Sequence, residues 1–210
     1  MRILLALVLT CIQVQAIELK VARGRFSLID FGSLIIAKPL VLNPKLVNIY
    51  PVSGLANEES QSVLVIQGLE EQGSTDLTVD TQAGIYQLHL VLNKDENQDL
   101  VLGQAQRTHI INATIPLKQS RSSIVSVPAH INRYILAADP SLVSYQNIKD
   151  YYHPDFLKVF AIGTNSKEGI TDLVVPSQAG VFKINLSIKG GQDEDHTNII
   201  DLASITSSSI

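Results

Sequence analysis

The stretch Gly73–Asn93, GSTDLTVDTQAGIYQLHLVLN, has a similar copy later in the chain. Gly169–Lys189 reads GITDLVVPSQAGVFKINLSIK. Nine of the 21 aligned positions are identical. The substitutions keep their chemical character, as where Tyr86 is replaced by Phe182. Such self-similarity at a fixed offset predicts that one structural unit has been duplicated.

The same offset of 96 residues aligns an earlier block of the chain. Residues 25–47, RFSLIDFGSLIIAKPLVLNPKLV, lie over residues 121–143, RSSIVSVPAHINRYILAADPSLV, without a gap. In this alignment Arg25 meets Arg121 and Leu40 meets Leu136. The repeat therefore predicts two tandem domains of about 80 residues each, a size at which small domains commonly fold.

The duplicated stretch has the alternation of a β-strand with one buried face. The side chains predicted to face inward are Tyr86, Leu88, Leu90 and Leu92 in the first copy, and Phe182, Ile184, Leu186 and Ile188 in the second. Those predicted to face outward include Gln87 and His89 in the first copy and Lys183 and Asn185 in the second. TQAG and SQAG predict the hairpin turns, in which Gly84 and Gly180 can take positive φ.

A helix-start signal precedes the hairpin in each copy. Asn43 and Asp139 can cap a helix, and Pro44 and Pro140 suit its first position, where a missing N–H costs nothing. The fold class predicted is thus α+β, mainly β, with two small domains that each combine an antiparallel or mixed sheet with one short helix. The alternative is two immunoglobulin-like β-sandwich domains, which a continuous strand in place of the helix would favour.

The predicted boundaries follow the repeat and the polar stretches around it. Residues 1–16 are predicted to be a signal peptide, 17–93 the first module and 94–114 an acidic polar linker. Residues 115–189 are predicted to form the second module and 190–210 a flexible tail, although Ile199–Leu202 can dock.

The signal-peptide prediction rests on Arg2, the apolar run Ile3–Leu9 and the small residue Ala16. A lipidated Cys11 is the alternative processing route. Cleavage after Ala16 leaves a mature chain without cysteine, which excludes disulfides and thiol catalysis in it. The formal charge of −4 argues against a nucleic-acid partner, and no later apolar run is long enough for a transmembrane span.

No catalytic, cofactor or metal site is predicted, and we expect no enzymatic activity. The five histidines are dispersed, and no Gly-rich phosphate loop or nucleophile elbow is present. Asp76 and Asp172 recur at the same offset after Gly73 and Gly169, and a turn-stabilising hydrogen bond to the backbone is the role predicted for them. An enzyme that uses these two carboxylates is the third hypothesis.

The order of these motifs resembles the pilus-assembly N-terminal domain of Tad-type pilus secretins. The segments that carry the resemblance are VLNPKLV (41–47) with the first hairpin, and LAADPSLV (136–143) with the second. Both copies lack the Lys and Pro that the family tends to carry before its hairpin. The resemblance implies a soluble periplasmic component without chemistry of its own, packed against neighbouring subunits.

The function expected is therefore that of a non-enzymatic assembly subunit of a pilus or secretion apparatus. Its partners would be secretin or pilus components, or further copies of the chain, held through sheet edges and two weak contacts at once. The alternative is a surface adhesin or structural protein with immunoglobulin-like repeats. The expected location is secreted, in the periplasm, with the cell surface as the alternative.

Overall fold

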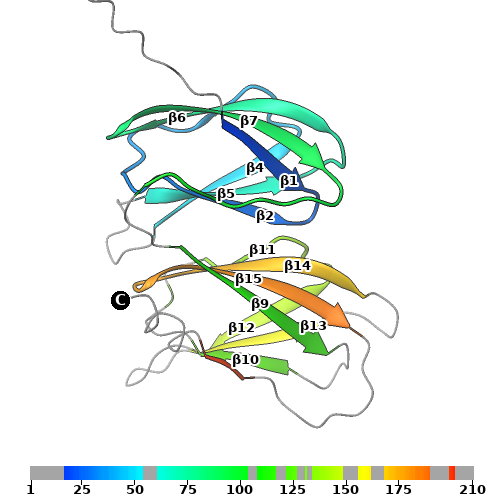
Figure 1. The fold of residues 1–210 in the computed structure, drawn as a ribbon. Helices are drawn as coiled ribbons and strands as arrows, with labels where there is room; N and C mark the ends of the chain where they lie inside the picture. The colour runs from blue at the N-terminus through cyan, green and yellow to red at the C-terminus, as the bar shows by residue number, and fades with distance from the viewer. Residues whose placement is uncertain are drawn as a thin grey trace, which may run out of the picture.

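A computed structural model describes residues 17–53, 61–103, 108–116, 122–126, 131, 134–148, 156–161, 168–189 and 199–201. Within these ranges the chain forms strands and turns and no helix. The strands build four sheets that lie in four successive layers, two to each domain (Figure 1). The predicted signal peptide, residues 1–16, lies outside the described residues.

The first domain is a sandwich of two four-stranded mixed sheets. Sheet A has the order β1 (Ile17–Ala22), β7 (Gly84–Asn93), β6 (Gly73–Thr81) and β3 (Leu40–Val41). Sheet B has the order β4 (Val47–Ser53), β5 (Gln61–Gly68), β2 (Phe26–Asp30) and β8 (Leu100–Val101). The neighbours pair antiparallel except β1 with β7 and β2 with β8, which pair parallel.

The second domain repeats this topology strand for strand. Sheet C has the order β11 (Leu136–Ala137), β14 (Gly169–Ser177), β15 (Gly180–Lys189) and β9 (Thr108–Pro116). Sheet D has the order β12 (Val143–Ile148), β13 (Phe156–Ala161), β10 (Ser122–Ser126) and β16 (Ile199–Asp201). Sheet C is therefore the counterpart of sheet A, and sheet D is the counterpart of sheet B. The predicted tandem repeat and β-rich composition are confirmed.

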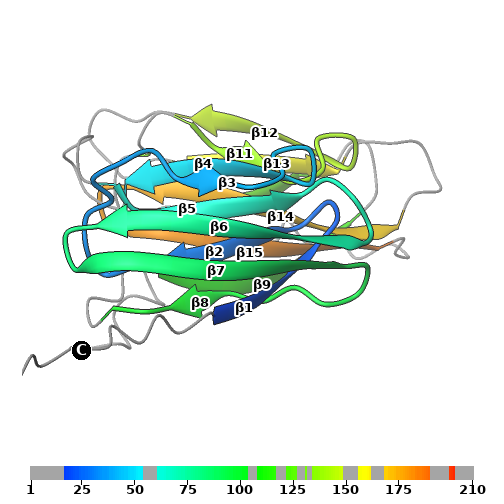
Figure 2. The ribbon, with the colours of Figure 1, turned by 90° about the horizontal axis from the view of Figure 1, so that it is seen from above.

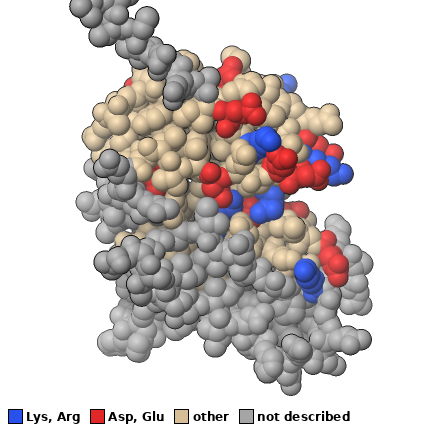
Figure 3. Space-filling view, viewed as in Figure 1, with Lys and Arg blue, Asp and Glu red and all other residues tan. Residues whose placement is uncertain are grey.

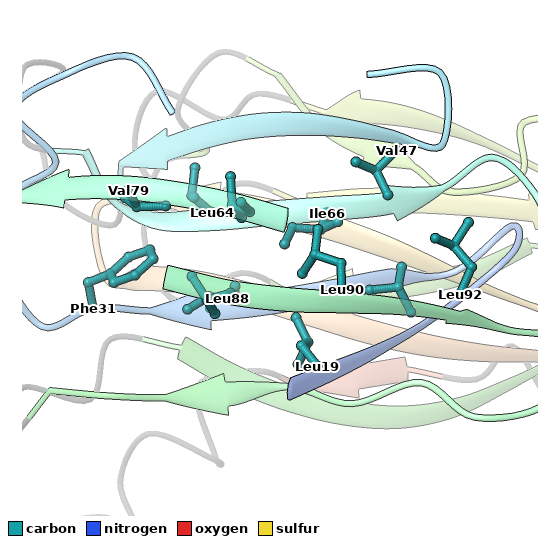
Figure 4. Close-up of a cluster of buried hydrophobic side chains, with 12 residues drawn as sticks. Leu19, Phe31, Val47, Leu64, Ile66, Val79, Leu88, Leu90 and Leu92 are labelled. Carbon is teal, nitrogen blue, oxygen red and sulfur yellow. The ribbon is translucent and has the colours of Figure 1, made fainter. Parts of the chain in front are cut away.

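The hydrophobic core of each domain lies between its two sheets. In the first domain Leu88, Leu90 and Leu92 of β7 point toward Leu64 and Ile66 of β5 (Figure 4). In the second domain, the predicted inward set Phe182, Ile184, Leu186 and Ile188 is buried with Val125. Each fully buried side chain of this size contributes roughly 1.5–3 kcal/mol, so the alternating strand holds each sandwich closed.

The predicted short helices are not formed. Leu46 N donates to Asn43 O over 3.2 Å, which closes a single turn, and Val47 then enters β4 opposite Gly68. Asp139 and Leu142 close the same turn before β12. A polar side chain followed by proline suits a tight turn as well as a helix start, and the branched residues after it favour a strand. The α+β prediction is wrong, and the β-sandwich alternative matches the structure.

The segment predicted as a linker contributes strands to both domains. Within residues 94–114, β8 completes sheet B and most of β9 begins sheet C. Asn97 is also bonded to the first domain, since its Oδ1 accepts from Ala22 N at 3.1 Å. The hydrogen bond and the charge of Glu96 raise the pKa of Lys20 on β1. Polar composition indicated solvent exposure, but it did not indicate that these residues bond to neighbouring strands.

The predicted flexible tail also contains a strand. Residues Ile199–Asp201 form β16, which pairs parallel with β10 from Ile124 to Ser126. This strand occupies the place that β8 has in the first domain. The remaining residues of the predicted tail lie outside the described residues.

The two sandwiches are stacked face to face. Sheet B of the first domain lies directly over sheet C of the second, so the layers follow the order A, B, C, D (Figure 1). Seen from above, the outer face of sheet A is turned to the viewer and the other layers lie behind it (Figure 2). The strands of one domain thus meet the other domain through side chains, with sheet faces in contact.

Candidate functional site

The interface between the domains is an apolar cluster formed by the facing sides of sheets B and C. Sheet B contributes Phe26, Leu28, Val52, Val63 and Val65, and the second domain contributes Ala138, Val174 and Val181, with Tyr50 and Leu136 packed against them. All eight residues of the central set are buried. The burial of apolar surface on both sides is the main term that favours docking of the two domains.

An ion pair between the domains lies at one end of this cluster. Asp172 on β14 is fully buried, and its Oδ2 accepts from Arg25 Nε and from Phe26 N, both at 2.8 Å. Arg25 is mostly buried and its Nη2 also donates to Asn185 Oδ1 at 3.4 Å. A buried carboxylate is tolerated only when it is paired and hydrogen-bonded, so these contacts fix the relative position of β2 and β14.

A second ion pair joins the domains beside the first. Lys183 on β15 is almost completely buried, and its Nζ lies 2.8 Å from both Asp99 Oδ1 and Asp99 Oδ2. Asp99 Oδ1 also accepts from Leu28 N at 2.8 Å. Acidic and basic side chains gather on one side of the first domain and at its junction with the second (Figure 3). The segment before β8 is therefore bonded to both domains.

A polar contact of Gln67 completes the interface. Gln67 Nε2 donates to Ala138 O of the second domain at 2.7 Å. Its Oε1 accepts from Tyr50 Oη at 3.0 Å, and the Tyr50 ring meets the Phe26 ring edge to face. The amide is thus held on both sides, which orients it for the interdomain hydrogen bond.

The corresponding face of sheet A is open to solvent. Residues that are buried in sheet C have exposed counterparts there: Val181 is 0% exposed and Ile85 66%, and Ala138 is 3% exposed and Leu42 76%. The outer face of sheet A, which we call the free face, consists of Leu40, Leu42, Asp76, Thr78, Ile85, Gln87 and His89. A hollow of about 700 Å³ lies on this face between β3, β6 and β7.

Asp76 on the free face is paired within its own domain. Its Oδ1 lies 2.7 Å from His89 Nδ1 on the neighbouring strand β7. Both side chains are substantially exposed, at 64% and 43%. Asp172, the counterpart of Asp76, instead has its bonds to the other domain, so one repeated residue has two different environments.

The roles predicted for the repeated aspartates are therefore incorrect. Neither Asp76 nor Asp172 is shown bonded to the backbone of its own turn; the backbone N–H that Asp172 accepts belongs to Phe26. The outward direction predicted for Lys183 is correct, but the side chain is buried because a second domain covers it. The alternation of side chains within one domain does not show that another domain covers this face.

The other singled-out residues stabilise turns. Asn43 Oδ1 accepts from Lys45 N at 3.3 Å, and Asp139 Oδ1 accepts from Ser141 N at 2.9 Å. Pro44 and Pro140 lie inside the same turns. The side-chain hydrogen bond predicted for a helix cap is present, but it closes a turn that leads into a strand.

The four repeated glycines lie at the ends of the hairpin strands. Gly84 and Gly180 have φ of 138° and 136°, as predicted for the hairpin turns, and Gly73 has φ of 134°. Gly169 instead allows a close approach, because a Cβ there would lie 3.0 Å from Leu142 Cδ1. These positions shape the domains and carry no chemistry of their own.

Sequence reasoning missed four residues that form polar contacts in the interface: Arg25, Gln67, Asp99 and Lys183. One signal was present for Arg25, because the repeat places it opposite Arg121 at the start of the aligned block. A difference between the copies, Lys183 against Gln87, marked the second ion pair. When an outward-facing position is charged in one copy and uncharged in the other, the two copies have different surroundings.

The described residues do not bring together three or more His, Cys, Asp or Glu side chains that could hold a metal ion. Among them there is also no helix with the length and apolar character needed to cross a bilayer.

No family model matches the chain, and no curated protein matches it. Solved structures of β-domains align over most of its length. A fragment of the surface layer protein SbsC, domains 4–9, aligns with a TM-score of 0.31 and 12% identity, over 84% of this chain and 31% of that one. The extracellular portion of mouse CD200RLa aligns with a TM-score of 0.25 and 8% identity, over 83% of this chain and 100% of that one.

A fragment of protocadherin gamma B7 with cadherin domains 1–4 aligns with a TM-score of 0.26 and 8% identity, over 82% of this chain and 49% of that one. The chain thus spans about a third of the SbsC fragment and about half of the protocadherin fragment. These TM-scores are below 0.5, so the assignment as two β-sandwiches rests on the strand order and register of the chain itself.

Proposed function

We propose that this chain is an exported, non-catalytic structural or adhesion protein. Its two domains act as one rigid body that contacts other proteins through a sheet face. The observation that carries the proposal is the buried contact of Asp172 with Arg25 and Phe26, set in an apolar interface between two sheets. Tandem domains joined only by a linker move independently, whereas a buried apolar interface restricts that motion.

The free face supports a protein partner over a small molecule. Ligand sites bury most of their ligand, whereas the hollow between β3, β6 and β7 opens onto a sheet face on which Leu40, Leu42 and Ile85 are 66–76% exposed. Exposed apolar residues grouped on one surface mark protein contacts in many soluble proteins. The paired Asp76 and His89 lie at the centre of the face, where they supply polar specificity.

The proposal follows the adhesin or structural alternative of the sequence analysis. Assembly in a pilus or secretion apparatus was inferred from a resemblance whose modules contain a helix, and residues 43–47 form a turn and the start of a strand. The predicted signal peptide supports export, to the periplasm or the cell surface. The mode of contact differs from strand addition at an edge, since the interface inside the chain joins two faces.

Photo-crosslinking in the cells that produce the chain tests this function. A photoreactive residue at Ile85 is expected to give a discrete adduct with a protein, because that side chain projects from the free face. The control carries the same residue at Glu71, an exposed position in the loop before β6. Equal, diffuse labelling from both positions, or no protein adduct from Ile85, would contradict a protein-binding function of this face.

A further inference from the structure

We infer that the free face of sheet A binds the outer face of sheet D in a second copy of this chain, so that copies join head to tail. The inference rests on the proposed function, since it names the partner of the same face. Its template is the interface inside the chain, where sheet C is docked on sheet B.

The free face is equivalent to a face that is already docked. β6 and β14 share one alternation, as do β7 and β15, and the outward positions match through the offset of 96 residues. Thr78 matches Val174, Ile85 matches Val181, and Leu42 matches Ala138. The second member of each pair is buried against sheet B. The first domain thus presents the same kind of surface, and none of the described residues covers it.

Leucine side chains on the free face are exposed at positions that are covered in the second domain. Leu40 and Leu42 on and beside β3 are 70% and 76% exposed, although their counterparts Leu136 and Ala138 belong to the interdomain cluster. If this face docks in both domains, the docking explains why leucines are exposed on the copy whose face is uncovered. Of the two residues that form ion pairs on the docked face, only the carboxylate is retained here: Asp76 matches Asp172, whereas Gln87 replaces Lys183.

The occupant that we infer for the free face is sheet D of a second copy. Sheet B receives sheet C, and sheet D is the counterpart of sheet B in strand order and register. Ile148 on β12 corresponds to Val52 on β4; Val52 is 9% exposed under the second domain, and Ile148 is 43% exposed. Ile124 has the register position of Leu28 in the interdomain cluster. Sheet D differs from sheet B at two positions of the cluster, since the register places Lys158 where sheet B has Val65 and Ser122 where it has Phe26. It therefore offers a more polar receiving surface with the same strand order.

The arginine that binds Asp172 has a counterpart in the sequence of the second copy of the repeat. Arg25, which binds Asp172, immediately precedes β2, and Arg121 immediately precedes β10. Arg121 lies outside the described residues, so this correspondence is one of sequence position.

The contact would be heterologous, because it joins two different faces. An interface of this kind does not close after two copies unless a rotation brings the ends together. The layer order A, B, C, D then continues into A, B, C, D of the next copy, and every added copy again leaves one free face and one sheet D. The expected product is an open linear assembly whose size rises with protein concentration.

Variants that block one end each provide the test, with the chain from residue 17 onward in sedimentation velocity. Ile85→Lys places a charge on the free face, and Ile148→Asp places one on sheet D. The wild-type chain is expected to form a concentration-dependent series of oligomers up to near-millimolar protein. Each blocked variant alone is expected to remain monomeric, and an equimolar mixture is expected to form a 1:1 complex and nothing larger.

Three results would overturn the inference: a monomeric wild-type chain over that range, a blocked variant that still forms a series of oligomers, or an Ile148→Asp variant that dimerises alone. The last result would show that two free faces bind each other. Leu42→Asp and Gln146→Arg are second blocks of the same two faces, for use if a first variant fails to fold by circular dichroism. A purified chain that stays monomeric while Ile85 crosslinks to a different protein would refute self-assembly and leave the proposed function standing.

Discussion

Asp172 and Asp76 occupy the same position in two copies of one strand, but Asp172 is sealed between two domains and Asp76 lies on an open sheet. This difference is a property of the assembly of the domains, because the local sequences TDL and the strand pairing are the same. It permits matched experiments in which one copy serves as the control for the other.

Asp172→Ala is expected to lower the free energy of unfolding by about 2–4 kcal/mol, since it leaves the partly buried Arg25 and the buried Phe26 N–H without their acceptor. Asp76→Ala is expected to change it by less than about 0.5 kcal/mol, because an exposed pair contributes little. Urea unfolding followed by circular dichroism measures both. Equal losses for the two variants would mean that the interdomain pair does not stabilise the chain.

The pair formed by Lys183 and Asp99 is expected to show a coupling energy of about 1–3 kcal/mol in a double-mutant cycle with Lys183→Met and Asp99→Asn. Either single substitution removes one member of a pair whose atoms lie 2.8 Å apart in a mostly buried site. Gln87→Met, at the position that matches Lys183, provides the control. Additive effects of the two substitutions would contradict a direct interaction.

Val181→Ala and Ile85→Ala compare one apolar position on a covered face and on an uncovered one. We expect Val181→Ala to cost about 1–3 kcal/mol, since it removes buried methyl groups and leaves a cavity in the interface. Ile85→Ala is expected to cost less than about 0.5 kcal/mol to a monomer. Thermal unfolding at low protein concentration separates this comparison from any self-association, and a larger loss for Ile85→Ala would reverse the assignment of the two faces.

Gly103→Ala is expected to destabilise the first domain by about 1–3 kcal/mol. A Cβ at Gly103 would lie 2.3 Å from Gly32 Cα, so one of two backbone segments must move. The movement would strain the adjacent hydrogen bond of 2.8 Å from Leu102 N to Asp30 O. Gln82→Ala in the exposed hairpin turn is the control, and a Gly103→Ala variant as stable as this control would show that the close approach is easily relieved.

The sequence was sufficient to predict the repeat and the buried stripe of each hairpin, because a strand with one covered face has a period of two. Leu88 and Ile184 are buried as that period requires. The turn at Asn43 was taken for a helix, since the same polar side chain and proline suit both structures. Only the long-range pairing of Val47 with Gly68 decides between them.

The candidate site depended on information that local patterns do not hold. Lys183 and Asn185 alternate with the core residues as solvent-facing side chains do, and the pattern is the same whether water or a second domain lies above them. The contact between Arg25 and Asp172 spans 147 positions of the chain. No period or spacing within one module predicts such a contact.

Stacking of sheet C on sheet B also has a consequence for the order of events during synthesis. β8 follows the other strands of the first sandwich, so this half can finish before β14 and β15 have emerged. Until then Phe26, Leu28 and Val65 belong to an apolar sheet face that is exposed to solvent. The nascent protein therefore passes through an aggregation-prone intermediate. Rapid synthesis of the second domain, or a chaperone that covers the exposed face of the first, protects this intermediate from aggregation.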